Sequence, residues 1–136
     1  MTTLTLSAER LNQITSAIIA AAIRVHRALG PGLLESAYRA CLCYELRQQG
    51  LQIETEKPLV LIYRDIKIDR AYCADIVVEM AVIVEVKAVE RLPRIAKNQL
   101  HTYLKLADCR VGLIMNFGML RMADGIERVV NKFPDS

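Results

Sequence analysis

Several features that would point to a function are missing from this sequence. The longest uncharged apolar run, residues 17–23, is far shorter than the roughly 18 residues that a membrane-spanning helix needs. The first residues lack the basic and apolar regions of a signal peptide. We therefore expect a cytoplasmic protein that does not cross a membrane.

Zinc chemistry has little support either. There are only two histidines, and none of the four cysteines forms a CxxC pair, the spacing that structural zinc sites commonly use. We interpret Cys41, Cys43, Cys73 and Cys109 as reduced thiols of the core. The net charge of +3 is too small to indicate nucleic-acid binding by itself.

The chain length fits one domain of ordinary size. A chain of 136 residues can bury a full hydrophobic core without disulfides or metal ions. No repeat, low-complexity tract or linker divides it. We expect a single domain over residues 1–136.

Charged residues interrupt the most apolar part of the chain. Residues 75–87 read Asp-Ile-Val-Val-Glu-Met-Ala-Val-Ile-Val-Glu-Val-Lys, a pattern that predicts two β-strands. Because side chains alternate between the faces of a strand, Glu85 and Lys87 share one face. The opposite face is apolar and is the expected core face, with Val82, Val84, Val86 and Ala88.

A hairpin would bring two of these acids together. With a three-residue loop at residues 79–81, Val78 pairs with Val82 and Asp75 lies opposite Glu85. Directly opposed side chains share a face with their Cβ atoms about 5 Å apart, where two unpaired carboxylates repel each other. A divalent cation would relieve that repulsion. Any odd loop length gives this arrangement, whereas a two- or four-residue loop separates the acids.

A purely structural interpretation fits the same residues. In it, Asp75 or Glu85 forms an exposed cross-strand ion pair with Lys87. The spacing alone favours neither interpretation.

Apolar periodicity predicts the order helix, helix, three strands, helix, strand, strand. Three consecutive strands most easily form an antiparallel meander, and the helix after them carries the chain to a parallel fourth strand. Pro58 argues for an edge strand. The expected fold class is α/β, with a mixed sheet flanked by helices. The expected helices are residues 7–29, 33–49 and 94–107, and the strands are residues 51–63, 66–78, 82–87, 110–117 and 126–130.

Details of the first two helices can also be predicted. Ser7 is the expected N-cap of the first helix, and Gly30 with Pro31 ends it. His26 lies in the last turn, where we expect it only to interact with the helix dipole. Apolar spacing predicts the buried side of the second helix, with Leu34, Tyr38, Cys41, Leu42 and Leu46.

A basic segment follows the acidic pair. Between residues 86 and 110 the sequence has six basic and two acidic residues. Such a composition is typical of a segment that flanks a catalytic site and binds the phosphates of a nucleic acid. Arg94 and Lys97 are its members at the start of the third predicted helix. A solvated helix face has the same composition, so the alternative stays open.

Two further groups of residues lie on the predicted helices. In Gly32-x-x-Glu35-x-x-Tyr38, Glu35 and Tyr38 are three apart and share a helix face. An acid in the first turn also simply stabilises the helix dipole. Gln99 and Tyr103, four apart, share a face of the third helix, where a buried tyrosine beside an exposed glutamine is the plainer interpretation.

Together these residues resemble the GxxExxY protein family, a group of small domains placed within the PD-(D/E)XK nuclease superfamily. The resemblance covers nearly the whole chain. Ala74 stands where the superfamily's name has proline, and a small residue keeps the strand regular. The residues that carry the resemblance are Gly30–Tyr38, Asp75, residues 84–90 (Val-Glu-Val-Lys-Ala-Val-Glu), residues 99–104 (Gln-Leu-His-Thr-Tyr-Leu), Asn116-Phe117 and residues 124–126 (Asp-Gly-Ile).

The resemblance implies a restriction-endonuclease-like αβββαβ core and a metal-dependent nuclease. Asp75 and Glu85 would be ligands of Mg²⁺ or Mn²⁺, and Glu35 would be an additional carboxylate aimed at the same metal. Lys87 would position or activate the attacking water.

The implied partner is nucleic acid, with DNA as the expected substrate. Gln99 and Tyr103 resemble a helix motif that helps to place the metal site and the DNA. Arg94 and Lys97 of the basic segment would contact phosphates, while Gly32 and Tyr38 would be structural.

Three functions compete at this point. The first is a metal-dependent nuclease, and the second is a nucleic-acid-binding or partner-binding module that keeps the fold and the metal site without turnover. The third is an oligomeric scaffold in which Asp75, Glu85 and Lys87 form an ion-pair cluster. The residues do not distinguish DNA from RNA or endonuclease from exonuclease, and a homo-oligomer is compatible with each function.

Overall fold

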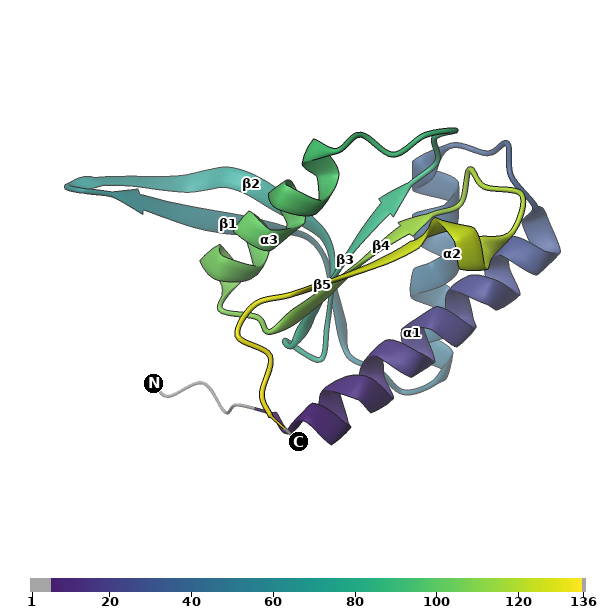
Figure 1. The fold of residues 1–136 in the computed structure, drawn as a ribbon, viewed down its shortest axis with the longest axis horizontal. Helices are drawn as coiled ribbons and strands as arrows, with labels where there is room; N and C mark the ends of the chain where they lie inside the picture. Colours follow the sequence, from purple (N-terminus) through teal and green to yellow (C-terminus); the bar gives the residue numbers. More distant parts are fainter. Residues whose placement is uncertain (1–5, 136) are drawn as a thin grey trace.

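The computed structural model describes residues 6–135 and is an α/β sandwich with three layers (Figure 1). The predicted order of helices and strands is confirmed, with one short 3₁₀ helix in addition. The elements are α1 (Ala8–Leu29), α2 (Glu35–Gln48), β1 (Ile53–Tyr63), β2 (Ile66–Val78), β3 (Val82–Lys87), α3 (Ile95–Ala107), β4 (Val111–Asn116), η1 (Met122–Gly125) and β5 (Ile126–Val130).

The five strands form one mixed sheet in the order β1-β2-β3-β4-β5. Neighbours are antiparallel except β3 and β4, which are parallel. α3 connects those two strands, as a parallel pair requires a crossover. The expected fold class, a mixed sheet flanked by helices on an αβββαβ core, is therefore confirmed.

Two hydrophobic clusters hold the three layers together. Val82, Val84 and Val86 pack with α1 and α2 on one face of the sheet. Ile83 packs with α3 on the other face, together with Leu100 and other residues of that helix. β4 is buried along its whole length because both faces are covered.

α1 begins as the sequence predicts, but its last turn differs. Ser7 is the N-cap, and its Oγ accepts a hydrogen bond from Arg10 N at 3.1 Å. The expectation that His26 only interacts with the helix dipole is wrong. His26 is 7% exposed, and its Nε2 is hydrogen-bonded to the carbonyl oxygen of Met119 at 2.7 Å. This bond ties α1 to the segment after β4, a contact between distant parts of the chain.

The predicted buried side of α2 needs two corrections, because neither Leu34 nor Cys41 is buried. Leu34 is 79% exposed, because it is the N-cap residue with extended backbone, and helical spacing does not apply before Glu35. Cys43 is buried instead. The expectation that all four cysteines lie in the core is also wrong, since the free thiol of Cys73 is exposed and that of Cys41 is half-buried.

β1 and β2 continue well beyond the body of the molecule as a long hairpin (Figure 1). β1 is an edge strand, as Pro58 predicts. Within residues 6–135, no helix is long and apolar enough to cross a membrane.

Candidate metal centre

The hairpin between β2 and β3 has the predicted register. Val78 pairs with Val82 and Ile76 with Val84, across a three-residue loop at residues 79–81. One step further along this register, Asp75 lies opposite Glu85, so the two side chains share a face. The prediction from an odd loop length is confirmed.

Asp75 and Glu85 bridge the two strands where their regular pairing stops. Asp75 N donates to Glu85 Oε2 at 2.8 Å, and Val86 N donates to Asp75 Oδ2 at 2.9 Å. These bonds use one oxygen of each carboxylate. The other oxygens, Asp75 Oδ1 and Glu85 Oε1, take part in neither bond.

Glu85 is an unusual carboxylate. It is 7% exposed, and burial, followed by the charge of Asp75, raises its pKa to about 7. The hydrogen bond from Asp75 and the charge of Lys87 act in the opposite direction but do not compensate. A cation bound beside Glu85 would favour its charged form against the effects of burial and of the charge of Asp75. Two convergent carboxylates fit the oxygen ligands that Mg²⁺ and Mn²⁺ prefer.

Lys87 is the last residue of β3, opposite Asn116 of β4. It lies two residues after Glu85 on the same face, about 7 Å along the strand. Within residues 6–135, no ion pair shorter than 4.0 Å involves Lys87. The cross-strand ion pair of the structural interpretation is therefore not formed.

Glu35 is the first residue of α2 and is exposed. Its charge adds to the causes that raise the pKa of Glu85, so the two carboxylates lie within electrostatic reach. Among the described residues, however, no three histidine, cysteine or acidic side chains gather closely enough to hold a metal. Glu35 thus does not complete a cluster with Asp75 and Glu85, and its role as a third metal ligand stays a prediction.

A family model described as the PD-(D/E)XK nuclease superfamily matches residues 12–129, which include both carboxylates and Lys87. The chain belongs to this superfamily. It thereby has a nuclease-type fold, in a group that acts on nucleic acid and typically uses divalent metals. Comparisons with curated proteins and with solved structures give no match.

In this superfamily member, Tyr38 shapes the loop that leads to Glu35. Its hydroxyl donates to the carbonyl oxygen of Gly30 at 2.5 Å and accepts from Leu33 N at 3.1 Å. The ring stacks on Phe117 with centroids 4.6 Å apart. Gly32, with φ +114°, adopts a backbone conformation that other residues rarely adopt. The Gly-x-x-Glu-x-x-Tyr motif therefore holds the start of α2 in place.

Arg39 is a charged neighbour of the site that the sequence reasoning missed. Its Nη1 lies 3.7 Å from Asp75 Oδ1, and its Nη2 lies 3.4 Å from Glu56 Oε1. Arg39 comes four residues after Glu35, on the same face of α2. That spacing is the signal that could have identified it.

Asn116 is the second residue whose position sequence reasoning missed. It is 2% exposed, and its Oδ1 accepts from Val89 N and Gly118 N while its Nδ2 donates to Val89 O, all at 3.0 Å. These bonds hold the segment after Lys87 against the end of β4. At Gly118 an added Cβ would lie 2.4 Å from Val89 O, so the close approach requires glycine.

Tyr103 and Gln99 match the plainer of their two interpretations. Tyr103 is buried, with its ring centroid 5.1 Å from that of Tyr72, whereas Gln99 is exposed. The pKa of Tyr103 is raised by burial first and then by the charges of Glu85, Tyr72 and Asp75. Tyr103 therefore lies beside the carboxylates, on the side of α3 that faces β2.

The two basic residues of the α3 start differ in their surroundings. Both Arg94 and Lys97 are exposed, but Lys97 Nζ forms an ion pair with Glu127 Oε2 of β5 at 3.1 Å. Lys97 thus lies on the β5 side of α3, whereas Tyr103 lies on the β2 side. Of the expected phosphate-binding flank, Lys97 already pairs with an acid of β5, and contact of Arg94 and Lys97 with phosphates stays a prediction.

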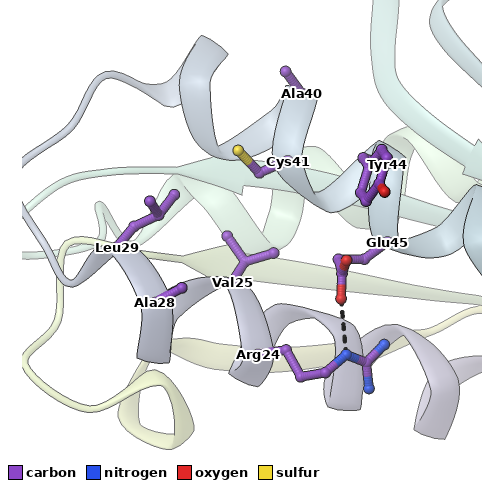
Figure 2. A pocket seen from close by; sticks show the side chains of 8 residues that line it. All are labelled: Arg24, Val25, Ala28, Leu29, Ala40, Cys41, Tyr44 and Glu45. Carbon is purple, nitrogen blue, oxygen red and sulfur yellow. Dashed lines mark hydrogen bonds and ion pairs between the residues drawn. The ribbon is translucent and has the colours of Figure 1, made fainter.

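A groove between α1 and α2 is lined by none of the predicted site residues. Its volume is about 400 Å³, and its lining is largely apolar (Figure 2). Its charged residues, Arg24 and Glu45, form an ion pair with each other at 2.9 Å. Neither is left to act on a substrate, and the groove has no counterpart of the carboxylate pair.

Proposed function

We propose that this protein is a metal-dependent nuclease that hydrolyses phosphodiester bonds in nucleic acid, with DNA as its substrate. Asp75 and Glu85 are the ligands of Mg²⁺ or Mn²⁺. Lys87 positions the attacking water. We also assign the chain to the GxxExxY family, as a single domain over residues 1–136 that works in the cytoplasm.

One observation carries the proposal. Asp75 and Glu85 converge where β2 and β3 separate, and burial together with mutual repulsion raises the pKa of Glu85 to about 7. Burial of Glu85 beside the half-buried Asp75 disfavours the charged form of Glu85, and the guanidinium of Arg39 pairs with Asp75 and not with Glu85. A bound cation would stabilise the charged form of both carboxylates, and we therefore interpret the pair as a metal site.

The remaining residues have roles that follow from their positions. Asp75 and Glu85 would hold the Mg²⁺ or Mn²⁺ ion, which would polarise the scissile phosphate and lower the pKa of the attacking water. Lys87, free of ion pairs within the described part of the chain, orients that water through its ammonium group. Glu35 approaches from α2 as an additional carboxylate, and Tyr103 supports the pair from α3.

Contacts to the nucleic acid come from exposed residues of α3 and the segment before it. Gln99 lies one turn before Tyr103 on the same side of the helix and would contact DNA next to the site. Arg94 and Lys97 contribute contacts to phosphates, which carry no sequence information.

A binding module without turnover is the second candidate, and one observation favours it. Arg39 lies 3.7 Å from Asp75 and already places a positive charge beside the pair. In such a module the guanidinium would take the place of the metal. The two candidates then differ in metal binding and turnover, not in affinity for nucleic acid.

A cleavage panel tests the proposal. Single- and double-stranded DNA and RNA are incubated with the protein and Mg²⁺, Mn²⁺ or EDTA. We expect cleavage with either metal, none with EDTA, and none by Lys87→Ala. Lys132→Ala is the matched control, because Lys132 is an exposed lysine beyond β5. Binding without cleavage under every condition would favour the silent module, and cleavage in EDTA would contradict the metal site.

A further inference from the structure

The long hairpin of β1 and β2 forms an arm, residues 59–72, that projects from the body (Figure 1). β1 is the edge of the sheet, and β3 pairs with β2 only at residues 76–78. Within the described chain, the arm is thus a two-stranded ribbon with both outer edges unpaired. Such a ribbon is marginally stable in water unless a further strand or a packed surface covers it.

One face of the arm is apolar. Leu61 pairs with Ile68 and Tyr63 with Ile66, and opposed pairs two residues apart along a hairpin share a face. Tyr63 is 60% exposed and Ile66 is 58% exposed. We call these four side chains the arm face: Leu61, Tyr63, Ile66 and Ile68.

The arm face continues a surface that the body covers. At the base of the arm, Leu59 pairs with Tyr72. Leu59 belongs to the hydrophobic cluster under α3, and the ring of Tyr72 contacts Tyr103 of that helix. The arm face is therefore the part of this apolar surface that lies beyond α3.

The charge of the arm argues against a nucleic-acid backbone as its partner. Residues 59–72 contain three basic and two acidic residues, a net charge of +1. One of the basic residues, Lys67, already forms an ion pair with Asp69 at 3.6 Å. Binding to phosphates relies on several cations that release counterions, whereas a nearly neutral apolar strip suits a protein partner.

The surface area agrees with an extended part of the molecule. The chain exposes 8437 Å², whereas a compact monomer of 15.3 kDa exposes about 7,100 Å² by the usual scaling with mass. The projecting arm contributes to this excess. A stable interface takes roughly 800 Å² from each partner, so a dimer contact would cover the arm face together with its flanking residues.

We propose that the arm is a dimerisation element, in which the arm face of one copy packs on the arm face of a second copy about a two-fold axis. An apolar patch is complementary to itself, as a two-fold interface requires. Edge-to-edge pairing of β1 is disfavoured by Pro58 and by the register shift between Leu59 and Leu61. Packing of the faces covers the side chains that the arm leaves in water.

The test measures mass in solution. Sedimentation equilibrium of the full chain in EDTA, without nucleic acid, should give twice the chain mass as concentration rises. Ile66→Lys should raise the dimer Kd at least about tenfold, since each dimer loses two apolar contacts and gains two charges. Ile95→Lys is the matched control, because Ile95 is 63% exposed at the start of α3, and it should leave the mass unchanged.

Hydrogen exchange gives a second measurement that does not depend on a variant. Amides of residues 61–68 should become more protected as parent concentration rises, and those of α1 should not change. A parent that is monomeric at every concentration overturns the proposal. A dimer that persists in the Ile66→Lys variant also overturns it. If the parent is a monomer and Ile66→Lys weakens only the binding of duplex DNA, the arm contacts nucleic acid and the proposal is wrong.

Discussion

Replacing Glu85 by glutamine tests the candidate metal centre most directly. The usual pKa of glutamate is 4.5, and in the folded protein the pKa of Glu85 is raised to about 7. Between these two values the folded state holds a proton that the unfolded state releases. The stability from Glu85 is therefore fully present below pH 4.5 and is lost as pH rises through about 7. At about 1.4 kcal/mol per pKa unit, the loss is about 3 kcal/mol.

Glu85→Gln removes this pH dependence. Glutamine keeps an oxygen that can accept the hydrogen bond from Asp75 N but has no charge to bury. In EDTA at pH 8 we expect the variant to be more stable than the parent by up to about 3 kcal/mol, or roughly 10 °C in Tm. At pH 4.5 the difference should vanish. With Mn²⁺ the order changes, because a cation that binds only the folded state stabilises the parent and not the variant.

The assay is urea unfolding and thermal melting at pH 4.5 and 8, with EDTA and with Mn²⁺. Glu54→Gln is the control, since Glu54 is half-exposed and its ion pair with Lys57 is a surface pair of small energy. The reasoning is refuted if Glu85→Gln is less stable than the parent at pH 8 in EDTA. That result is what an ion-pair cluster with Lys87 predicts, because a partly buried ammonium would lose its partner.

Three further predictions concern other parts of the site. Asp75→Asn should abolish both Mn²⁺ stabilisation and cleavage while leaving metal-free stability unchanged or raised, measured by the same melts; a variant that still responds to Mn²⁺ would remove Asp75 from the ligand set. Tyr38→Phe should cost about 1–3 kcal/mol in urea unfolding, because it removes two part-buried hydrogen bonds, to Leu33 N and Gly30 O, each worth about 0.5–1.5 kcal/mol. Tyr44→Phe, at an exposed tyrosine, should cost little, and equal effects would contradict the role of the loop. Arg94→Ala should weaken DNA binding on every sequence and reduce the salt dependence of the affinity by about one phosphate contact, measured by fluorescence anisotropy. Lys97→Ala should weaken binding less, since the Lys97 ammonium already pairs with Glu127. An affinity that does not depend on salt would mean that DNA binds elsewhere.

Much of the fold follows from the local pattern of the chain. The alternation of side chains and the three-residue loop at residues 79–81 place Asp75 opposite Glu85, because hairpin register depends only on the loop and its two strands. The helices follow from apolar spacing and from end signals such as Ser7. Each of these inferences uses residues that are close together in the sequence, where geometry leaves few alternatives.

The errors lie where the pattern was applied beyond an element or to a contact between elements. Leu34 fits the helical spacing of α2 but precedes the helix, so its side chain is exposed. His26 sits where a dipole interaction is expected, yet it binds a carbonyl 93 residues away. A periodicity says which side of a helix is apolar, but it does not say what that side or its ends contact.

The sequence by itself therefore determined the elements, their order and the face shared by Glu85 and Lys87, whereas Asp75 shares that face because the loop of the folded hairpin has three residues. Only the tertiary structure decided which groups surround that face. Arg39 comes to Asp75 from α2, Asn116 fixes the segment after Lys87 from β4, and Lys97 turns to β5 instead of the carboxylates. The projection of residues 59–72 beyond α3 is likewise set by the lengths of elements that pack side by side. Such contacts join segments far apart in the chain, and they depend on how whole layers pack, which no local spacing encodes.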